Sequence, residues 1–268
     1  MAKVERQAVS DLSLSEATRA RVAALGPWFY DFEFPGGVRT GAGIPVSRLG
    51  VHETRLRMLE DLFEREPGLV NGSALDVGCH EGYFSLALRR AGFGRVVGVD
   101  LRPGHIEKAR LAAELMGVNG LSFHAMDAEE LDRDLPEETF GLALMFGLIY
   151  HLESPMRVLR QAAARVGAGG VVVIETQLSD EGAASVEWGH RDHRMPVVGS
   201  LAVVDESSVH AVNRETGATP LALCPSAAAV HAMLRAAGFG RTEQLPPHKG
   251  AHEQFARGRR GIFVGRRA

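Results

Sequence analysis

The sequence predicts an α/β fold with a seven-stranded, mostly parallel sheet and helices on both faces. From residue 73 onward, short apolar runs alternate with amphipathic segments, and the connections between them are brief. This alternation is typical of parallel strands joined by crossover helices. The expected strands are 73–77, 95–100, 121–125, 140–146, 169–176, 241–245 and 261–264, and the expected helices are about 82–92, 104–116, 155–167 and 225–238.

Composition narrows the class of protein. The chain has 268 residues, of which 45% are hydrophobic and 24% charged, as in ordinary globular proteins. A net charge of -3 gives no general attraction to nucleic acid or membranes, and two cysteines cannot form a disulfide framework. The chain shows neither a signal peptide nor an apolar run of the roughly 18 residues that span a membrane. We expect a soluble, cytoplasmic protein without a nucleic-acid or membrane partner, and a homodimer is left open.

Residues 1–68 are expected to form an N-terminal cap of helices and a β-hairpin. An amphipathic pattern over 13–25 begins with a capping box, which predicts a first helix. The aromatic stretch 27–34 alternates with acids, and a Pro-Gly-Gly turn leads back through 38–40, which predicts the hairpin. A second amphipathic helix is expected over 51–66.

Residues 69–268 are expected to form the main domain, with an insertion at 177–222 after the fifth strand. The insertion breaks the alternation of strands and helices, is largely polar and contains one clear apolar run at 197–204. Insertions after a strand of a parallel sheet often carry binding residues. We place this one over the carboxyl edge of the sheet.

A turn between the first strand and helix of this domain predicts a cofactor site. The strand carries Asp76 and leads into a turn with Gly78 and Gly82, where a ligand can approach bare backbone. The next apolar run also ends in an acid, Asp100. An acid before the turn repels a pyrophosphate but suits the amine of S-adenosylmethionine (SAM), so SAM is favoured over a dinucleotide. His80 stands where a dinucleotide fingerprint would have its middle glycine.

These motifs resemble those of class I SAM-dependent methyltransferases, which have a Rossmann-like fold. Residues 75–82 look like the first motif of that family and residues 97–100 like the second. By this resemblance, Asp76 and the glycine backbone hold the methionine end of SAM, and Asp100 accepts hydrogen bonds from the two ribose hydroxyls.

The resemblance implies further cofactor contacts at the ends of neighbouring strands. Leu101 would flank the adenine ring, and Asp127 would face its exocyclic amine. Cys79, Ala128 and Phe146 complete the expected cofactor-binding set.

A narrower resemblance points to one branch of the family. Residues 28–40, 146–152 and 174–176 are similar to a branch that contains the tRNA wobble-uridine carboxymethyltransferase and methyltransferases of secondary metabolism and sugar modification. In that carboxymethyltransferase, residues that look like Tyr150 and Arg260 contact the extra carboxylate of a carboxylated cofactor. Its lysines have no clear counterpart in this chain, which favours ordinary SAM.

Methyl transfer from a sulfonium depends mainly on alignment of acceptor and donor, so no fixed catalytic set is required. A base helps when the acceptor is a hydroxyl or a protonated amine. His151, just past the fourth strand, is the expected base, and its alternative role is packing under the following loop. Tyr150 is expected to contact the cofactor or the transferred methyl group.

The acceptor pocket is expected between the cap and the insertion. Trp28 and Tyr30 would contribute from the hairpin, and Trp188, His190 and His193 from the insertion. Arg260 completes the expected substrate set. Two alternatives stand beside this reading: the aromatic residues bury the cap against the sheet, and the histidines belong to an exposed polar loop. The two histidines could also ligate a metal, but a complete metal site is not expected.

The sequence thus predicts a SAM-dependent methyltransferase that modifies an oxygen or nitrogen of a small molecule, such as a secondary metabolite or a sugar. Two alternatives are kept. One is an RNA-modifying transferase of the wobble-uridine type, and the other is a SAM-binding module without transfer activity.

Overall fold

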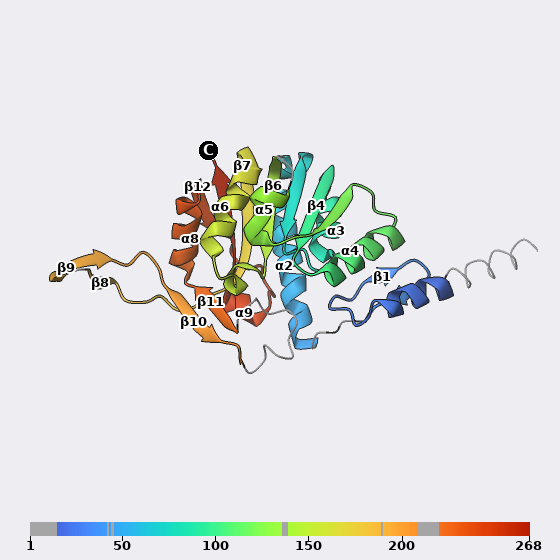
Figure 1. Ribbon diagram of the computed structural model, residues 1–268, viewed down its shortest axis with the longest axis horizontal. Coiled ribbons are helices and arrows are strands. Elements are labelled where there is room, and N and C mark those ends of the chain that lie inside the picture. Colours follow the sequence, from blue (N-terminus) through green and yellow to red (C-terminus); the bar gives the residue numbers. More distant parts are fainter. Residues whose placement is uncertain (1–14, 42, 44–45, 136–138, 189, 208–219) are drawn as a thin grey trace, which may run out of the picture.

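The central sheet has seven strands in the order β12-β13-β7-β6-β3-β4-β5 (Figure 1). All neighbouring pairs from β7 to β5 are parallel, and β13 runs antiparallel to both of its neighbours. The predicted α/β fold is therefore confirmed. The strands are β3 Ser73–Val77, β4 Arg95–Asp100, β5 Leu121–Ala125, β6 Phe140–Phe146, β7 Val166–Gln177, β12 Phe239–Gln244 and β13 Arg260–Arg267. The computed structural model describes residues 15–41, 43, 46–135, 139–188, 190–207 and 220–268.

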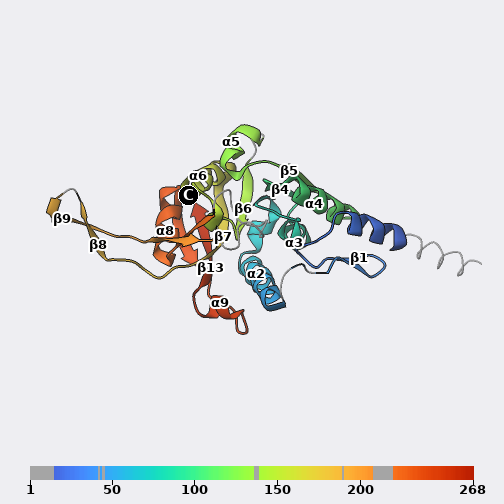
Figure 2. The same ribbon diagram turned by 60° about the horizontal axis from the view of Figure 1, so that its bottom comes forward.

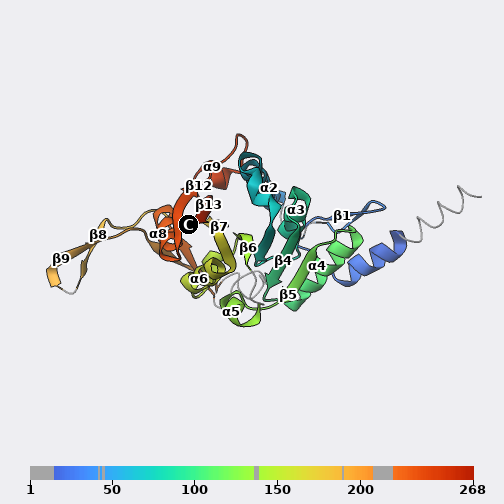
Figure 3. The same ribbon diagram turned by 90° about the horizontal axis from the view of Figure 1, so that it is seen from above.

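Helices cover both faces of the sheet (Figure 3). One buried cluster joins the sheet to α2, α3 and α4, and a second joins its other face to α5, α6 and α8. Successive strand residues point to opposite faces, so Ala74 packs in the first cluster and Leu75 in the second. The helices are α2 Val46–Arg65, α3 Tyr83–Ala91, α4 Pro103–Leu115, α5 Leu131–Asp134, α6 Pro155–Arg165, α8 Ala227–Ala236 and α9 Glu253–Ala256, with 3-10 turns η1 Pro67–Asn71, η2 Ala128–Glu130 and η3 Ile149–His151.

The N-terminal cap has less strand than the sequence predicts. A helix covers residues 15–24, and the predicted strand over 27–34 is reduced to β1 Glu33–Phe34, paired with β2 Val38–Arg39. The aromatic residues before β1 instead pack on one another, with ring centroids 5.7 Å apart for Trp28 and Phe32. These side chains belong to the same core cluster as α2 and α3, so the cap shares the hydrophobic core of the main domain. Ser13, the expected N-cap of the first helix, lies outside the described residues.

The insertion forms two hairpins that occupy different places. One, β10 Leu201–Asp205 with β11 Leu221–Pro225, packs on η3 at the carboxyl end of β6. The other, β8 Ser185–Trp188 with β9 His190–Pro196, projects from the body as an arm (Figures 1 and 2). The placement over the carboxyl edge of the sheet is therefore correct for β10 and β11 and wrong for the β8–β9 arm. No helix in the described part of the chain is long and apolar enough to cross a membrane.

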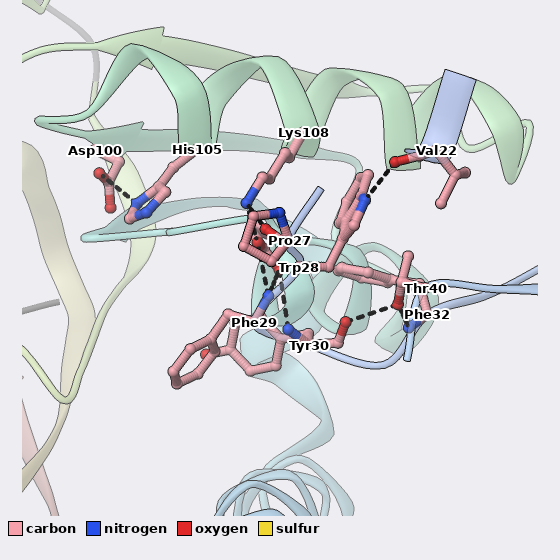
Figure 4. A network of polar contacts seen from close by, with 11 residues as sticks. Val22, Pro27, Trp28, Phe29, Tyr30, Phe32, Thr40, Asp100, His105 and Lys108 are labelled. Atoms are coloured by element: carbon pink, nitrogen blue, oxygen red, sulfur yellow. Dashed lines mark hydrogen bonds and ion pairs between the residues drawn. The ribbon is translucent and has the colours of Figure 1, made fainter. Parts of the chain in front are cut away.

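Glu81 attaches the cap to the rest of the domain, and Figure 4 shows its partners Phe29, Tyr30 and Lys108 gathered around one point. Its carboxylate has no exposed surface and accepts hydrogen bonds from the backbone N–H groups of Phe29 and Tyr30, at 2.9 Å each. Lys108 on α4 donates to the same carboxylate at 2.8 Å and also to the carbonyl of Pro27. A buried carboxylate is tolerated only when it is paired and hydrogen-bonded, so the cap and α4 satisfy this charge together.

Replacing Glu81 with glutamine should lower the free energy of unfolding by about 2–3 kcal/mol, because Lys108 loses its counter-ion in a largely buried site. Urea unfolding followed by circular dichroism measures this loss. Glu107→Gln is the matched control, since Glu107 is an exposed residue of α4, the helix that carries Lys108. Equal stability of the two variants would contradict the anchoring role.

Candidate functional site

The turn between β3 and α3 has an unusual backbone. Gly78 and Gly82 have φ values of +76° and +79°, and His80 between them also adopts the left-handed region at +52°. The N–H groups of Gly78 and Cys79 both donate to the carbonyl of Val99, at 2.8 and 2.9 Å. The turn is therefore tied to the end of β4. His80 adopts the left-handed conformation although it is not a glycine. Histidine tolerates this conformation better than most residues do.

Asp100 ends β4 directly beside this turn. Its carboxylate accepts the N–H groups of His80 and Arg102, at 3.0 and 2.9 Å, and lies 3.1 Å from Nδ1 of His105 (Figure 4). Burial alone would raise the pKa of Asp100, but the hydrogen bonds and charge of His105 and the Arg102 N–H hold the pKa below its usual value. Asp100 is therefore an ionised acceptor, which suits the two hydroxyl donors of a ribose.

Leu101 and Asp127 lie at the same edge of the sheet. Leu101 is 56% exposed, although it is a large apolar residue directly after Asp100. The N–H of Met126 donates to the carbonyl of Asp100 at 2.9 Å, which places the ends of β4 and β5 side by side. Asp127 then caps η2, where it accepts the N–H of Glu129 at 2.8 Å. An exposed apolar side chain between two acids suits an adenine ring with its amine.

Asp76 lies under the turn and is almost completely buried. Burial raises the pKa of Asp76 to about 7, and the charge of Asp100 adds to this, although Ser85 donates to the Asp76 carboxylate at 2.6 Å and opposes the shift. A carboxyl group poised near neutral pH would ionise fully beside a cationic ligand. Acidic strand ends and a glycine-containing turn therefore fit SAM, which carries an ammonium, a sulfonium and hydroxyl donors.

The remaining predicted cofactor residues lie close to this frame. Cys79 is buried in the turn, and burial raises the pKa of its thiol, so it is a packed residue. Ala128 begins η2 next to Asp127. Phe146 ends β6 and packs edge-on against Phe84, with centroids 5.0 Å apart.

A buried ion cluster lies beside the next two strand ends. Glu175 on β7 has no exposed surface and pairs with Arg55 and with Arg260, whose Nη1 lies 2.9 Å from Oε1. The Arg260 guanidinium also lies 5.9 Å from the centre of the Tyr150 ring. Burial would raise the pKa of Glu175, but the two arginines hold it below its usual value. The predicted residues Tyr150 and Arg260 are thus in contact.

Arg55 and His52 were not predicted as site residues. Arg55 lies on the buried face of α2, and this position is the signal that the sequence offers, because an arginine interrupts the apolar stripe formed by Val51, Met58 and Leu62. Nη1 of Arg55 lies 3.3 Å from Nδ1 of His52. Burial, reinforced by Arg55 and Arg260, lowers the pKa of His52 to about 2, so this ring is neutral.

Tyr30 lies near the cofactor turn, whereas Trp28 does not. The Tyr30 ring stacks on Tyr83 at 4.7 Å and approaches His52 and His80 at 4.9 and 5.6 Å. Trp28 is only 4% exposed, and its indole N–H donates to the carbonyl of Val22 at 2.8 Å. As a substrate contact Trp28 is therefore corrected to a core residue, in agreement with the alternative that the aromatic residues bury the cap.

The insertion residues predicted to bind substrate are carried on the β8–β9 arm. His193 is exposed on β9, and the backbones of Trp188 and His190 lie at the far end of the same hairpin. The structure does not bring them to the end of β4, which carries Asp100, or to η3, which carries His151. Among the described residues, no group of His, Cys, Asp and Glu side chains could hold a metal ion.

Comparison with known proteins gives a family. The model of a family described as a methyltransferase domain matches residues 51–223. A tRNA U34 carboxymethyltransferase of Shewanella sp. (strain ANA-3) is 34% identical over 113 residues, which are 42% of this chain and 33% of the relative. The ubiquinone biosynthesis O-methyltransferase of Aeromonas salmonicida (strain A449) is 31% identical over 126 residues, 47% of this chain and 52% of the relative. The chain thus spans between a third and about half of the length of these relatives.

Solved structures share the fold. The N-terminal domain of EvdMO1, in the presence of S-adenosylhomocysteine and D-fucose, has a TM-score of 0.69 and 25% identity, with 94% of this chain and 97% of that chain covered. Magnesium protoporphyrin IX methyltransferase from Synechocystis PCC 6803 with bound S-adenosylhomocysteine has a TM-score of 0.55 and 13% identity over 85% of this chain and 90% of its own. The second likeness shows the fold alone.

Asp76→Asn should stabilise the cofactor-free protein above neutral pH. Because burial raises the folded-state pKa to about 7, the unfolded chain ionises first as pH rises, so the wild type loses stability between about pH 4 and pH 7. We expect Asp76→Asn to gain about 2–4 kcal/mol at about pH 8 and little at about pH 4, where the carboxyl is protonated in both states. Thermal unfolding at both pH values checks this, with the exposed Asp132→Asn as control. A variant no more stable than wild type at the higher pH would show that the pKa is not raised.

Asp100→Ala should weaken S-adenosylhomocysteine binding by about 100-fold or more, because two hydrogen bonds to a charged acceptor are lost. Isothermal titration calorimetry measures the dissociation constant. Asp132→Asn again serves as the control and should bind as tightly as wild type. Undiminished binding by Asp100→Ala would remove Asp100 from the cofactor site.

Proposed function

This chain belongs to the methyltransferase domain family and uses SAM as its cofactor, and we propose that it methylates an oxygen or nitrogen of a small molecule, most specifically a sugar-like hydroxyl. The observation that carries this proposal is the position of His151. It lies in η3, which follows β6. Leu148, in the same loop, packs closely on Gly78 of the cofactor turn, since a Cβ atom added to Gly78 would lie only 3.2 Å from the Leu148 side chain. A candidate base therefore follows a loop that touches the turn.

The proposed chemistry assigns a simple role to each part of the site. Bound SAM would supply an electrophilic methyl group on a sulfonium whose leaving group is a neutral thioether. Asp76 and Asp100 would hold the amine and the ribose, which fixes where the methyl group lies. His151 would take the proton of an acceptor hydroxyl, and η3 and the β10–β11 hairpin would orient that acceptor.

The sugar-like acceptor is supported by the likeness to the EvdMO1 domain, which covers nearly all of both chains and was determined with D-fucose. The ion cluster also bears on the cofactor. Nη1 of Arg260 donates to Glu175 at 2.9 Å and its Nε donates to Gln254 at 2.8 Å, so these donors are already used inside the protein. This supports ordinary SAM over a cofactor with an extra carboxylate.

An RNA-modifying transferase is the second candidate. It is favoured by the identity to tRNA U34 carboxymethyltransferases and by the contact of Arg260 with Tyr150, the pair that resembles the carboxylate-binding residues of that branch. The likeness extends over only about a third of the length of those relatives, so it supports the activity of the whole relative less than it supports the family.

Transfer of a radiolabelled methyl group separates these candidates. The protein is incubated with labelled SAM and, separately, with D-fucose and related deoxysugars, with bulk tRNA, and with cell-extract fractions. Label in a small, RNase-resistant product supports the proposal. Label that is released by RNase would overturn it in favour of the second candidate, and absence of transfer to any cell-extract fraction would favour a SAM-binding module.

His151→Ala should lower kcat by about 100-fold or more, because general-base assistance to a hydroxyl acceptor is lost. The affinity for S-adenosylhomocysteine should stay within about two-fold of wild type, since His151 lies outside the acidic cofactor frame. His124→Ala, an exposed histidine on β5, is the matched control and should leave kcat unchanged. An unaltered rate in His151→Ala would eliminate the base.

A further inference from the structure

Glu206, at the end of β10, faces His151 across the interface between the insertion and η3. Oε2 of Glu206 lies 3.5 Å from Nδ1 of His151, and the two side chains are only 20% and 18% exposed. These two atoms are themselves buried. The distance is that of an ion pair and is longer than a direct hydrogen bond. Such contacts between a base and the group that orients it are often long before substrate binds.

The backbone holds both residues in place. The His151 N–H donates to the carbonyl of Leu148 at 2.9 Å, and the Glu206 N–H donates to the carbonyl of Pro220 at 2.7 Å. A small apolar cluster of Tyr150, Ala222 and Cys224 joins η3 to β11. The β10–β11 hairpin therefore carries Glu206 to His151 on a paired strand end and not on a free loop.

Two further groups bear on this pocket, Arg260 and the Cys224 thiol. Arg260 approaches from β13 over the Tyr150 ring and shares the carboxylate of Glu175 with Arg55, so this arginine pair keeps a net positive charge. Burial raises the pKa of the Cys224 thiol on β11, and the negative charge of Glu206 raises it further, while Arg260 opposes the shift. The charge of Glu206 is thus felt within this pocket, beside the imidazole.

We propose that Glu206 is a positioning residue for His151: its carboxylate holds the Nδ1–H of the imidazole, so that Nε2 is presented to the acceptor hydroxyl. This inference rests on the proposed function. In the transfer, the acceptor oxygen bonds to the methyl carbon, the carbon–sulfur bond breaks with its electron pair left on sulfur, and the acceptor proton passes to Nε2. The resulting imidazolium lies beside a carboxylate, which stabilises its positive charge.

The pair can be tested without any acceptor. Two-dimensional 1H–15N NMR of 15N-histidine-labelled protein saturated with S-adenosylhomocysteine reports the tautomer and the pKa of His151. A neighbouring carboxylate favours the protonated imidazole, so Glu206→Gln should lower the pKa of His151 and reduce the Nδ1–H tautomer. Asp205→Asn, whose carboxylate bonds Ser207 instead, is the matched control and should change neither. Titration curves that coincide in wild type and Glu206→Gln would overturn the proposal.

Kinetics with the small-molecule acceptor then test the role in transfer. Glu206→Gln should lower kcat by about 10- to 100-fold with KM for SAM nearly unchanged, and Glu206→Asp should restore part of the rate. The acidic limb of the pH–rate profile should move to lower pH, in step with the lowered pKa. In a His151→Ala background, Glu206→Gln should cause no further loss, because the two residues act as one unit. Multiplied losses would place Glu206 in another role and overturn the proposal.

Failure of the two proposals can be told apart. If wild type transferred no label to D-fucose, related deoxysugars or extract fractions, the proposed function and the role of Glu206 in transfer would both fall. If wild type transferred label but Glu206→Gln kept the wild-type rate and pH profile, only the positioning role would fall.

Discussion

The buried carboxylate of Glu81 is the interaction on which the relative position of cofactor turn and cap depends. Glu81 lies between His80 and Gly82, within the turn, yet its partners are the backbone of Phe29 and Tyr30 and the ammonium of Lys108. Since a carboxylate without exposed surface must be compensated inside the protein, the cap cannot detach without leaving this charge unpaired. The aromatic rings that approach His52 and His80 are consequently fixed relative to the cofactor turn.

Around this anchor the site is divided by charge. The ends of β3 and β4 carry acids, and Asp76 and Asp100 lie close enough for the charge of one to raise the pKa of the other. The end of β7 and the start of β13 carry a carboxylate enclosed by two guanidinium groups, Arg55 and Arg260. A cationic cofactor matches the acidic side. The arginine side has one carboxylate for two guanidinium groups, and Arg260 lies over the ring of Tyr150, the residue before His151.

The sheet and the acids at its strand ends could be predicted from the sequence, because their signals are local. Parallel strands buried on both faces are continuous apolar runs, and Asp100 marks a strand end, so the bounds of β3 to β6 agree with the expected ranges. Arg55, Glu81 and Glu206 could not be assigned, because each acquires its role from a partner distant in sequence. Trp28 was misassigned for a related reason: hairpin alternation cannot distinguish a face turned to a ligand from a face turned to the core.

The β10–β11 hairpin has a consequence for how the activity of this domain can diversify. The acids of the candidate cofactor site, Asp76, Asp100 and Asp127, lie on or directly after β3, β4 and β5, whereas Glu206, which faces the candidate base, comes from the insertion between β7 and α8. Under the proposed function, exchange of that segment would alter acceptor choice and proton transfer together while methyl-donor recognition was inherited intact. Selectivity in such a protein can evolve as a module.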